Sequence, residues 1–445
     1  MSDAESPDDT DEQSADFQPS EPNTGSDFEP VQVFPDDETM DLRPGADSCY
    51  KCSTCDTNCP VAEVDDDFPG PKFQGPEQWR LKQTEEGYDV DDSITDCSNC
   101  MRCDNACPSG VPLSQMHNEA RGEYVREEVS RLSRTYWRNR ILANYRTFAA
   151  IGSKVPRLAN FVLNNGVVQW VNEKTLGITS ERSFPEFASQ TFREWWRERG
   201  GPAVQSDEKR VAYFHGCYAN YNTPEVGKAL VRVFESFGYE VVVPEQRCSG
   251  TPMFANGMLP DARRGASVNV ASLSDLVDEG YDAVCSCTSC SMALRQEYPE
   301  LFDFEGTDRV AANTFEALEY LRIHEDLEGE LADASVDLPA FAYHAPCHAR
   351  NQGLERQALE LFRELDGVTV EDVGDSCSGI SGTYGWKAEK YEKSMAIGEE
   401  MFEHMDAAEG TTGLTECPTC AMQMEHGTGY EITHPLEVLE AALVE

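Results

Sequence analysis

Short apolar runs alternate with amphipathic stretches through the second half of the chain. In residues 206–330 this pattern predicts three strands and two helices, in the order Arg210–Phe214, Pro224–Phe237, Tyr239–Val243, Asp261–Val277 and Asp282–Cys285. Short β-rich runs that alternate with helices are typical of a parallel sheet whose strands are connected by helices. We therefore expect a small parallel α/β unit in this region.

The same pattern occurs a second time, in residues 331–445. V-A-Y-F-H-G-C in the first copy corresponds to F-A-Y-H-A-P-C in the second, and A-V-C-S-C-T-S-C corresponds to L-T-E-C-P-T-C. From Cys217 to Cys248 is 31 residues and from Cys347 to Cys377 is 30. The next intervals, to Cys287 and Cys417, are 39 and 40 residues. This regular spacing predicts two copies of one domain.

Before the repeats, the apolar positions follow helical periodicity. We expect a helix from Leu113 to Glu128 and a short one from Phe187 to Arg199, which ends at the Gly200-Gly201-Pro202 boundary. Residues 129–172 contain no acidic side chain and seven basic ones: Arg131, Arg134, Arg138, Arg140, Arg146, Lys154 and Arg157. A basic helix with an aromatic-rich apolar face can lie on an anionic membrane surface. The alternative is a helical linker that packs between domains or docks a partner subunit.

The charge of the chain limits its partners and its surroundings. Its 445 residues include 81 acidic and 36 basic side chains, a net charge of −45, which argues against nucleic acid as a partner. An acidic excess along the whole chain suits concentrated salt, so we interpret it as typical of the cytosol of an extreme halophile. Residues 1–47 carry fifteen acidic residues and one basic residue, and we expect a disordered acidic tail there. We expect neither a signal peptide nor a transmembrane helix.

Two cysteine runs carry the clearest chemical signal. Each has the spacing C-x2-C-x2-C-x3-C-P, by which bacterial ferredoxins hold two [4Fe–4S] clusters. The fourth cysteine of such a run ligates the other cluster. We therefore assign Cys49, Cys52, Cys55 and Cys107 to cluster 1, and Cys97, Cys100, Cys103 and Cys59 to cluster 2. Zinc fits this spacing less well because it usually takes paired C-x2-C knuckles, and disulfides are rare in a reducing cytoplasm.

The whole layout, from about Cys49 to Leu443, resembles the family of the C subunit of anaerobic glycerol-3-phosphate dehydrogenase. C-S-G-I-S-G-T-Y-G-W-K at Cys377–Lys387 is the most telling stretch. P-G-P-K at Pro69–Lys72, R-Q-E-Y-P at Arg295–Pro299 and H-P-L at His434–Leu436 also match the family pattern. The wider superfamily includes heterodisulfide reductase subunits and the iron–sulfur subunits of glycolate and lactate oxidases.

The resemblance implies an electron-transfer subunit on the inner face of the cell membrane, in the cytoplasm and peripherally attached. Its expected partners are an FAD-containing dehydrogenase subunit, a second flavoprotein or an anchor subunit, and membrane quinone. We expect no flavin or NAD and no catalytic residue on this chain. A relay for a glycolate or lactate oxidase, or a heterodisulfide-reductase-like complex, is the alternative.

The resemblance also marks possible further cluster ligands in the repeats: Cys217, Cys248, Cys287, Cys290, Cys347, Cys377, Cys417 and Cys420. The superfamily has a Cys-Cys-Gly tripeptide in each repeat, whereas this chain has Ser249 and Ser378 at the second position. Four thiolates per repeat can hold an ordinary cluster, and a site without a cluster is the alternative. We expect Cys285 to be a small buried hydrophobe.

We expect a helical two-cluster ferredoxin-like domain at 48–125, a basic helical linker at 126–205, and cysteine-rich α/β domains at 206–330 and 331–445. His215, His344 and His348 lie beside cluster-loop cysteines and are candidates for hydrogen bonds to sulfur. We expect Gly379, Gly382 and Gly385 to let the backbone wrap close to Cys377.

Overall fold

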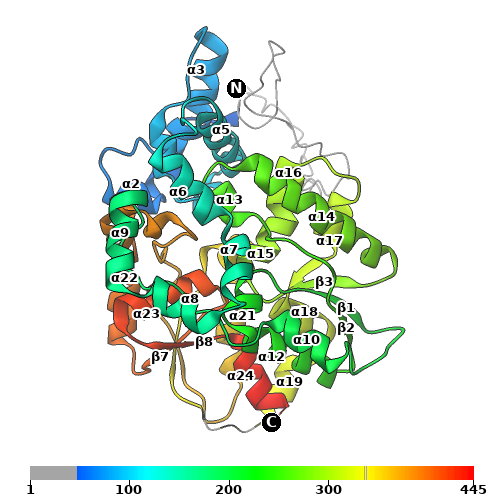
Figure 1. The fold of residues 1–445 in the computed structure, drawn as a ribbon. Helices are drawn as coiled ribbons and strands as arrows, with labels where there is room; N and C mark the ends of the chain where they lie inside the picture. Colours follow the sequence, from blue (N-terminus) through cyan, green and yellow to red (C-terminus); the bar gives the residue numbers. More distant parts are fainter. Residues whose placement is uncertain (1–47, 335, 337, 445) are drawn as a thin grey trace, which may run out of the picture.

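The computed structural model describes residues 48–334, 336 and 338–444, so the predicted acidic tail lies outside the described residues. A helical N-terminal region is followed by two α/β units, each built on a four-stranded sheet (Figure 1). All neighbouring strands within the two sheets are parallel. The predicted fold class is therefore confirmed.

The two sheets have the same strand order, β2-β1-β3-β4 in the first repeat and β6-β5-β7-β8 in the second. The first sheet consists of β1 (Arg210–Phe214), β2 (Glu240–Val242), β3 (Asp282–Cys285) and β4 (Thr314–Glu316). The second consists of β5 (Phe341–Tyr343), β6 (Val370–Asp372), β7 (Thr412–Leu414) and β8 (Glu431–Thr433). The sequence pattern did not predict β4 and β8, which form the fourth strand of each sheet.

The first strand of each repeat lies between the second and third strands. In register, Val211 of β1 pairs with Val241 on one side and Asp282 on the other. Phe341 of β5 pairs in the same way with Val370 and Thr412. The chain thus leaves the first strand in one direction and returns on its other side. The carboxyl ends of β1 and β3, and of β5 and β7, are topological switch points, where open parallel sheets build their binding sites.

Helices cover both sheets. In the first repeat they are α11 (Tyr218–Tyr221), α12 (Pro224–Ser236), α13 (Thr251–Phe254), α14 (Leu259–Asp278), α15 (Thr288–Met292), α16 (Tyr298–Leu301), α17 (Thr307–Ala312), α18 (Ala317–His324) and α19 (Leu327–Ala332). In the second they are α20 (Cys347–Arg350), α21 (Gln357–Phe362), α22 (Tyr391–Ala407), α23 (Pro418–Thr428) and α24 (Pro435–Leu443). The helices expected at 224–237 and 261–277 are observed as α12 and α14, with ends shifted by one or two residues.

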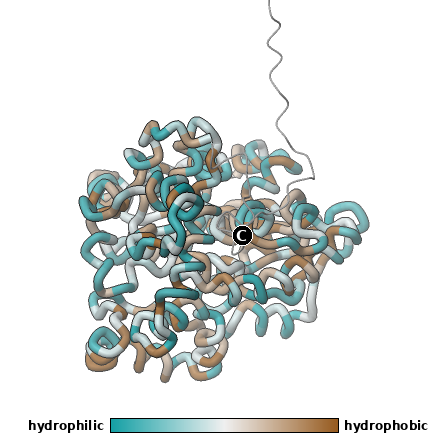
Figure 2. The backbone as a smooth tube through the Cα atoms, turned by 90° about the horizontal axis from the view of Figure 1, so that it is seen from above, coloured by the Kyte–Doolittle hydropathy of each residue, from teal (hydrophilic) through white to brown (hydrophobic). Residues whose placement is uncertain are grey.

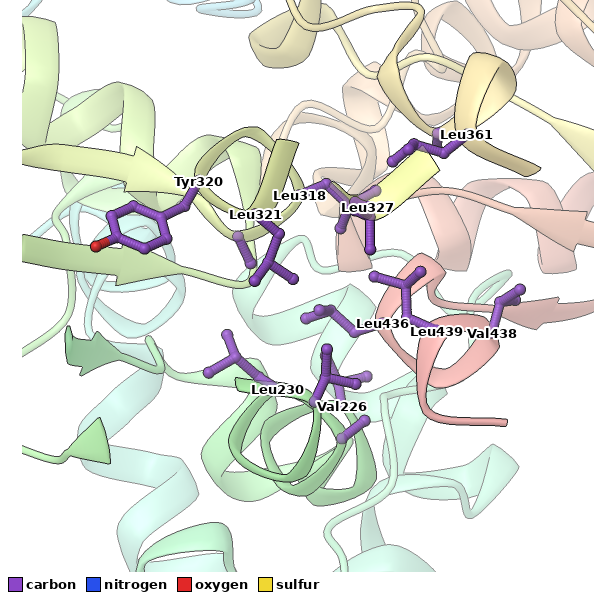
Figure 3. Packing of buried hydrophobic residues seen from close by; sticks show 14 of the residues in the cluster. Val226, Leu230, Leu318, Tyr320, Leu321, Leu327, Leu361, Leu436, Val438 and Leu439 are labelled. Atoms are coloured by element: carbon purple, nitrogen blue, oxygen red, sulfur yellow. The ribbon is translucent and has the colours of Figure 1, made fainter. Parts of the chain in front are cut away.

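The two repeats share one hydrophobic core. Figure 3 shows Val226 and Leu230 of α12 close to Leu436 and Leu439 of α24, with Leu318 of α18 above them. These five side chains are buried, and full burial of one such side chain contributes about 1.5–3 kcal/mol. The shared core fixes the orientation of one repeat relative to the other.

The regular elements of the N-terminal region are helices. Its first helices are α1 (Thr54–Thr57), α2 (Pro60–Val64), α3 (Gln78–Thr84), α4 (Arg102–Ala106) and α5 (Leu113–Glu127). The helix expected from Phe187 begins only at Phe192, as α10 (Phe192–Arg199), because Thr191 and Glu194 form a capping box that fixes its start. The expected start of this helix was wrong by five residues.

The acid-free segment folds into four short helices, α6 (Arg134–Ala143), α7 (Tyr145–Gly152), α8 (Pro156–Leu163) and α9 (Gly166–Leu176). In α8 and α9 no residue is buried. Figure 2 shows stretches of hydrophobic residues at the rim of the molecule. Within the described residues, no helix combines the length and the apolar character needed to cross a membrane.

Candidate iron–sulfur centres

The two C-x2-C-x2-C loops of the helical region have the same unusual backbone conformation. Lys51 and Ser53 in the first loop, and Asn99 and Met101 in the second, have φ angles between 57° and 63°. Such left-handed conformations cost a residue with a side chain on the order of 1–3 kcal/mol. Apart from these four, Ser381 is the only non-glycine residue in the described part with positive φ. The strain bends each loop around a centre and is typical of a ligand-binding site.

Each loop receives its fourth cysteine from the other run. Two small cavities are each lined by four cysteines: Cys49, Cys52, Cys55 and Cys107 line site 1, and Cys59, Cys97, Cys100 and Cys103 line site 2. All of these cysteines are free. Four thiols around one cavity fit a [4Fe–4S] cluster, which takes four cysteine thiolates. The structure thus brings together both predicted quartets, including the exchanged fourth members.

Site 1 lies near the surface. Cys52 is exposed, and hydrogen bonding to the Thr54 hydroxyl, 3.3 Å from its sulfur, lowers the pKa of the Cys52 thiol. Beside the site, Lys72 forms an ion pair with Asp56 at 3.1 Å. Site 1 can therefore be reached from the outer surface at Cys52.

Site 2 is more enclosed than site 1, and the Arg121 cation lies beside it. Burial would raise the pKa of Cys97, but the Arg121 guanidinium and a contact with His117 outweigh it and lower this pKa to about 6. The Nδ1 atom of His117 lies 3.9 Å from the Cys97 sulfur, and Arg121 donates to the Cys97 carbonyl oxygen at 3.3 Å. Arg121 is only 2% exposed, so solvent screens its charge little. The sequence analysis missed Arg121 and His117, because both lie on α5 at ordinary helical positions.

All eight predicted repeat cysteines line a single cavity of about 200 Å³ between the two repeats: Cys217, Cys248, Cys287, Cys290, Cys347, Cys377, Cys417 and Cys420. In each repeat these cysteines follow the first, second and third strands, so they stand at the switch points of the two sheets. Cys100 of site 2 lines the same cavity. A cavity lined by so many free thiols suits iron–sulfur chemistry.

Sulfur atoms in this cavity lie close to one another in two groups. Cys377 is in hydrogen-bonding contact with Cys100 of site 2 and with Cys347. Across the boundary between the repeats, Cys287 is in the same kind of contact with Cys417, which also contacts Cys420. Within the described residues, no three His, Cys, Asp or Glu side chains are placed to hold a single metal ion. The thiols surround cavities, not a site for a single metal ion.

Polar contacts hold the site 2 loop against the second repeat. Arg102 donates to the Asp375 carbonyl oxygen at 3.2 Å, and Asn351 donates to the Cys100 carbonyl oxygen at 3.2 Å. Asn105 and Asn351 are joined by a side-chain hydrogen bond of 2.9 Å. These bonds fix the distance between Cys100 and the cysteines of the second repeat.

The three histidines selected from the sequence have other partners. His215 contacts the Gly216 carbonyl oxygen at 2.6 Å, and His348 contacts the Ser289 hydroxyl at 2.9 Å. Burial lowers the pKa of His344 to about 4, and neither of its ring nitrogens has a hydrogen-bond partner within the described residues. Of the histidines discussed, His117 is the one in contact with a cysteine sulfur.

The structure gives a different reason for two of the glycines after Cys377. A Cβ atom on Gly379 would lie 2.1 Å from the Ser394 carbonyl oxygen, and one on Gly385 would lie 2.4 Å from the Ser394 hydroxyl. The close approach of α22 therefore requires both glycines, and the Gly379 backbone N–H also bonds the Cys377 sulfur, so the backbone does pass close to it. Cys285 is fully buried in β3 and does not line the cavity, as expected for a packing residue.

Comparisons with known proteins agree with this arrangement. Residues 45–111 match a 4Fe-4S dicluster domain, and residues 211–295 and 341–425 each match a cysteine-rich domain. The chain is 32% identical over 409 residues to the C subunit of the anaerobic glycerol-3-phosphate dehydrogenase of Escherichia coli K12, covering 89% of this chain and 98% of that protein. These matches confirm the predicted iron–sulfur cofactors.

Two more distant relatives have other names. The B subunit of the fumarate reductase (CoM/CoB) of Methanothermobacter marburgensis is 24% identical over 437 residues, covering 92% of this chain and 75% of that protein. The probable glycolate oxidase iron-sulfur subunit of Bacillus subtilis is 25% identical over 405 residues, covering 85% of this chain and 88% of that protein. All three relatives are named as subunits, which indicates that the chain works within an oxidoreductase complex.

Proposed function

The chain belongs to the family of the C subunit of anaerobic glycerol-3-phosphate dehydrogenase, and on this premise we propose that it is the iron–sulfur relay of such a dehydrogenase. An FAD-containing partner subunit oxidises sn-glycerol 3-phosphate to dihydroxyacetone phosphate. This chain accepts the electrons one at a time and passes them to membrane quinone. The coarser description, an iron–sulfur electron-transfer subunit of an oxidoreductase, follows from the domains and the relatives together.

The observation that carries the proposal is that the two kinds of cysteine site meet, because Cys100 of site 2 also lines the cavity of the repeat cysteines. In this proposal the quartets of sites 1 and 2 hold one [4Fe–4S] cluster each, and the repeat cysteines hold one or two more. A bound cluster supplies one-electron oxidation and reduction. The proposed path begins at the exposed Cys52 of site 1, passes through site 2 and crosses from Cys100 to Cys377. It then continues through the shared cavity to Cys417, which contacts Cys287 of the first repeat.

The protein residues around the path keep its charge in balance. Arg121 at site 2 and Arg102 at the boundary with the second repeat place two buried or half-buried cations beside cysteine thiolates. Burial would lower the pKa of Arg102, but the thiols of Cys347, Cys100 and Cys377 and the Asp375 carboxylate raise it. These cations stabilise the negative charge that thiolates and electrons bring into a dry interior.

We place the membrane contact on the apolar helix surface, which we define as the exposed apolar side chains of residues 148–171. Its members are Phe148, Ile151, Val155, Leu158, Phe161, Val162, Val167, Trp170 and Val171, which are 41–71% exposed. In the described part of the chain, only Tyr50, Leu132, Trp137, Ile323 and Val444 are other large apolar side chains with comparable exposure. Exposed apolar area of this extent is typical of an interaction surface.

The cations of the acid-free segment divide into two groups. Arg138 is 4% exposed and pairs with Glu389 at 2.7 Å, and Arg140 pairs with Asp261 at 2.9 Å. The charge of Arg146 acts on the thiols of Cys217 and Cys248. Arg131, Arg134, Lys154 and Arg157 are exposed, and Lys154 and Arg157 lie within the stretch that forms the apolar helix surface. An apolar face bordered by cations suits an anionic bilayer surface better than a protein partner, and it would attach the chain peripherally to the inner face of the cell membrane.

A deletion strain tests the proposal. Membranes that lack this chain should still reduce an artificial dye with glycerol 3-phosphate, because the flavin subunit oxidises the substrate, but they should no longer reduce quinone. Normal quinone reduction from glycerol 3-phosphate, together with loss of glycolate- or lactate-dependent reduction, would assign the chain to the other oxidase instead. If dye reduction is lost as well, adding the purified chain back to the membranes should restore quinone reduction only when the flavoprotein is supplied with it.

A further inference from the structure

We propose that Ser249 and Ser378 are potential-setting residues, whose hydroxyls donate hydrogen bonds to the thiolates of Cys290 and Cys420. Each bond raises the reduction potential of the cluster that the cysteines of its repeat hold. The inference rests on the proposed function, because it requires the repeat cysteines to be cluster ligands. It assigns a role to the two positions at which this chain departs from the Cys-Cys-Gly pattern.

The two contacts are close to equal. The Ser249 hydroxyl oxygen lies 3.5 Å from the Cys290 sulfur, and the Ser378 hydroxyl oxygen lies 3.3 Å from the Cys420 sulfur. Both serines are 4% exposed and line the shared cavity. Neither hydroxyl has another hydrogen-bond partner within residues 48–334, 336 and 338–444. Each serine is therefore directed at a sulfur atom and away from water.

The contact is built twice, by corresponding residues of the two repeats. Each serine directly follows the second cysteine of its repeat, Cys248 or Cys377, and each sulfur belongs to the last cysteine of the C-x2-C pair. The sequences around the two serines differ, R-C-S-G-T-P in one repeat and S-C-S-G-I-S in the other. The same contact in different surroundings indicates a property of the site rather than of local packing.

The direction of the bond follows from the state of the sulfur. A cysteine that ligates iron is a thiolate without a hydrogen, so the hydroxyl must be the donor. A one-electron reduction adds one negative charge to the site and forms or breaks no bond in the protein. A donor aimed at the thiolate stabilises the reduced state more than the oxidised state, and hydrogen bonds to sulfur are an established means of tuning these potentials.

The consequence is a pair of sites tuned in the same direction. With a hydroxyl donor in each repeat, electrons that arrive from site 2 meet two acceptors of raised potential. A cysteine at either position would add a thiolate and its negative charge instead, which would lower the potential. The serines thus favour storage of electrons in the cavity until the acceptor takes them.

The test is a redox titration of the full-length, cluster-loaded protein, with dithionite as reductant and electron paramagnetic resonance as the readout. In S249A and S378A we expect a lower potential for the cluster of the changed repeat, seen as a severalfold drop in its reduced fraction at a fixed ambient potential. The signals of sites 1 and 2 should not shift. S378T, which keeps the hydroxyl, should restore the wild-type potential. S291A is the matched control, because the Ser291 hydroxyl is buried beside Cys290 but donates to the Thr288 carbonyl oxygen at 3.1 Å.

The outcomes separate this inference from the proposed function. Unchanged potentials in S249A and S378A, with full iron content, would overturn the role of the serines and leave the relay intact. Wild-type protein with no more iron than sites 1 and 2 account for would overturn both. If an alanine variant loses iron, the hydrogen bond from the serine hydroxyl can still be tested on the wild-type protein by its hyperfine coupling. Its reduced repeat clusters should show a hyperfine-coupled proton that exchanges in D2O, and absence of that coupling contradicts the proposal.

Discussion

The sulfur of Cys100, in the helical region, is in hydrogen-bonding contact with the sulfur of Cys377, in the second repeat. Cys100 belongs to site 2 and Cys377 to the cavity between the repeats, so the two kinds of centre meet at this pair. Val61 and Phe68 of the helical region and Tyr384 and Ile397 of the second repeat form a hydrophobic cluster around it. Cys377 is the second-repeat cysteine in contact with a site 2 sulfur, so in the proposed relay the second repeat would take electrons from site 2 first.

The exchange of fourth ligands can be tested with C59A. We expect this variant to lose the cluster of site 2, about four irons per chain, because Cys59 stands with Cys97, Cys100 and Cys103. The cluster of site 1 should keep its spectrum, although Cys59 is closest in sequence to the site 1 cysteines. Iron analysis and electron paramagnetic resonance measure both, with C285A as a control that removes a buried thiol outside the sites. Loss of the site 1 signal alone would contradict the assignment.

A buried carboxyl beside site 2 predicts a pH dependence of stability. Burial raises the pKa of Glu297 to about 8, although the Asn99 amide donates to its carboxyl at 3.5 Å. The folded protein therefore keeps a proton up to about pH 8 that the unfolded chain releases near its ordinary pKa of 4.5. The folded state binds more protons between these values, so its stability falls as the pH rises through this window.

In E297Q the thermal midpoint should rise at pH 8 relative to wild type, by the equivalent of about 2–5 kcal/mol, and little at pH 5. The exposed E305Q should change neither, and equal midpoints of E297Q and wild type at pH 8 would refute the interpretation.

Sequence and structure agree best where the signal is local. The four-cysteine spacing identified both loops and both quartets, because a cluster requires ligands at short, fixed intervals. The positive φ angles of Lys51 and Met101 could not be predicted, since neither residue type favours that conformation and the closed loop imposes it. Arg121 was missed for a related reason: its partners Asn99 and Phe254 come from distant parts of the chain, which only the fold brings together.

The apolar helix surface predicts binding to anionic vesicles. Leu158 and Phe161 of α8 are 62% and 71% exposed, and transfer of one such side chain out of water contributes about 1.5–3 kcal/mol. L158D/F161D should therefore bind phosphatidylserine-containing vesicles at least about tenfold more weakly than wild type in a sedimentation assay. I323D is the matched control, because Ile323 is 59% exposed but lies outside the surface. K154E/R157E should weaken binding mainly at low salt, where anionic lipids attract each cation by about 1 kcal/mol.

Two results would count against a membrane contact. If L158D/F161D sediments with vesicles as wild type does, the surface does not meet lipid. If vesicle binding is unchanged and the flavoprotein no longer co-purifies, the segment docks a partner protein, which is the alternative that the sequence left open. A membrane-facing role for Arg138 and Arg146 is not supported, because one is buried in an ion pair with Glu389 and the other acts on the repeat cysteines.

The relay itself can be interrupted at Cys377. In C377A we expect sites 1 and 2 to keep their clusters, because Cys377 belongs to neither quartet, and dithionite should reduce both as in wild type. Quinone reduction by the reconstituted complex should fall at least about tenfold, because the contact that joins Cys100 to the second repeat is lost. C285A removes a buried cysteine of β3 that does not line the cavity, so it should reduce quinone at the wild-type rate.

Normal quinone reduction in C377A would mean that electrons leave the chain before the repeats. Loss of the site 2 signal in C377A would instead make Cys377 a ligand of that site, and would move the boundary between the two centres from the Cys100–Cys377 pair into the second repeat.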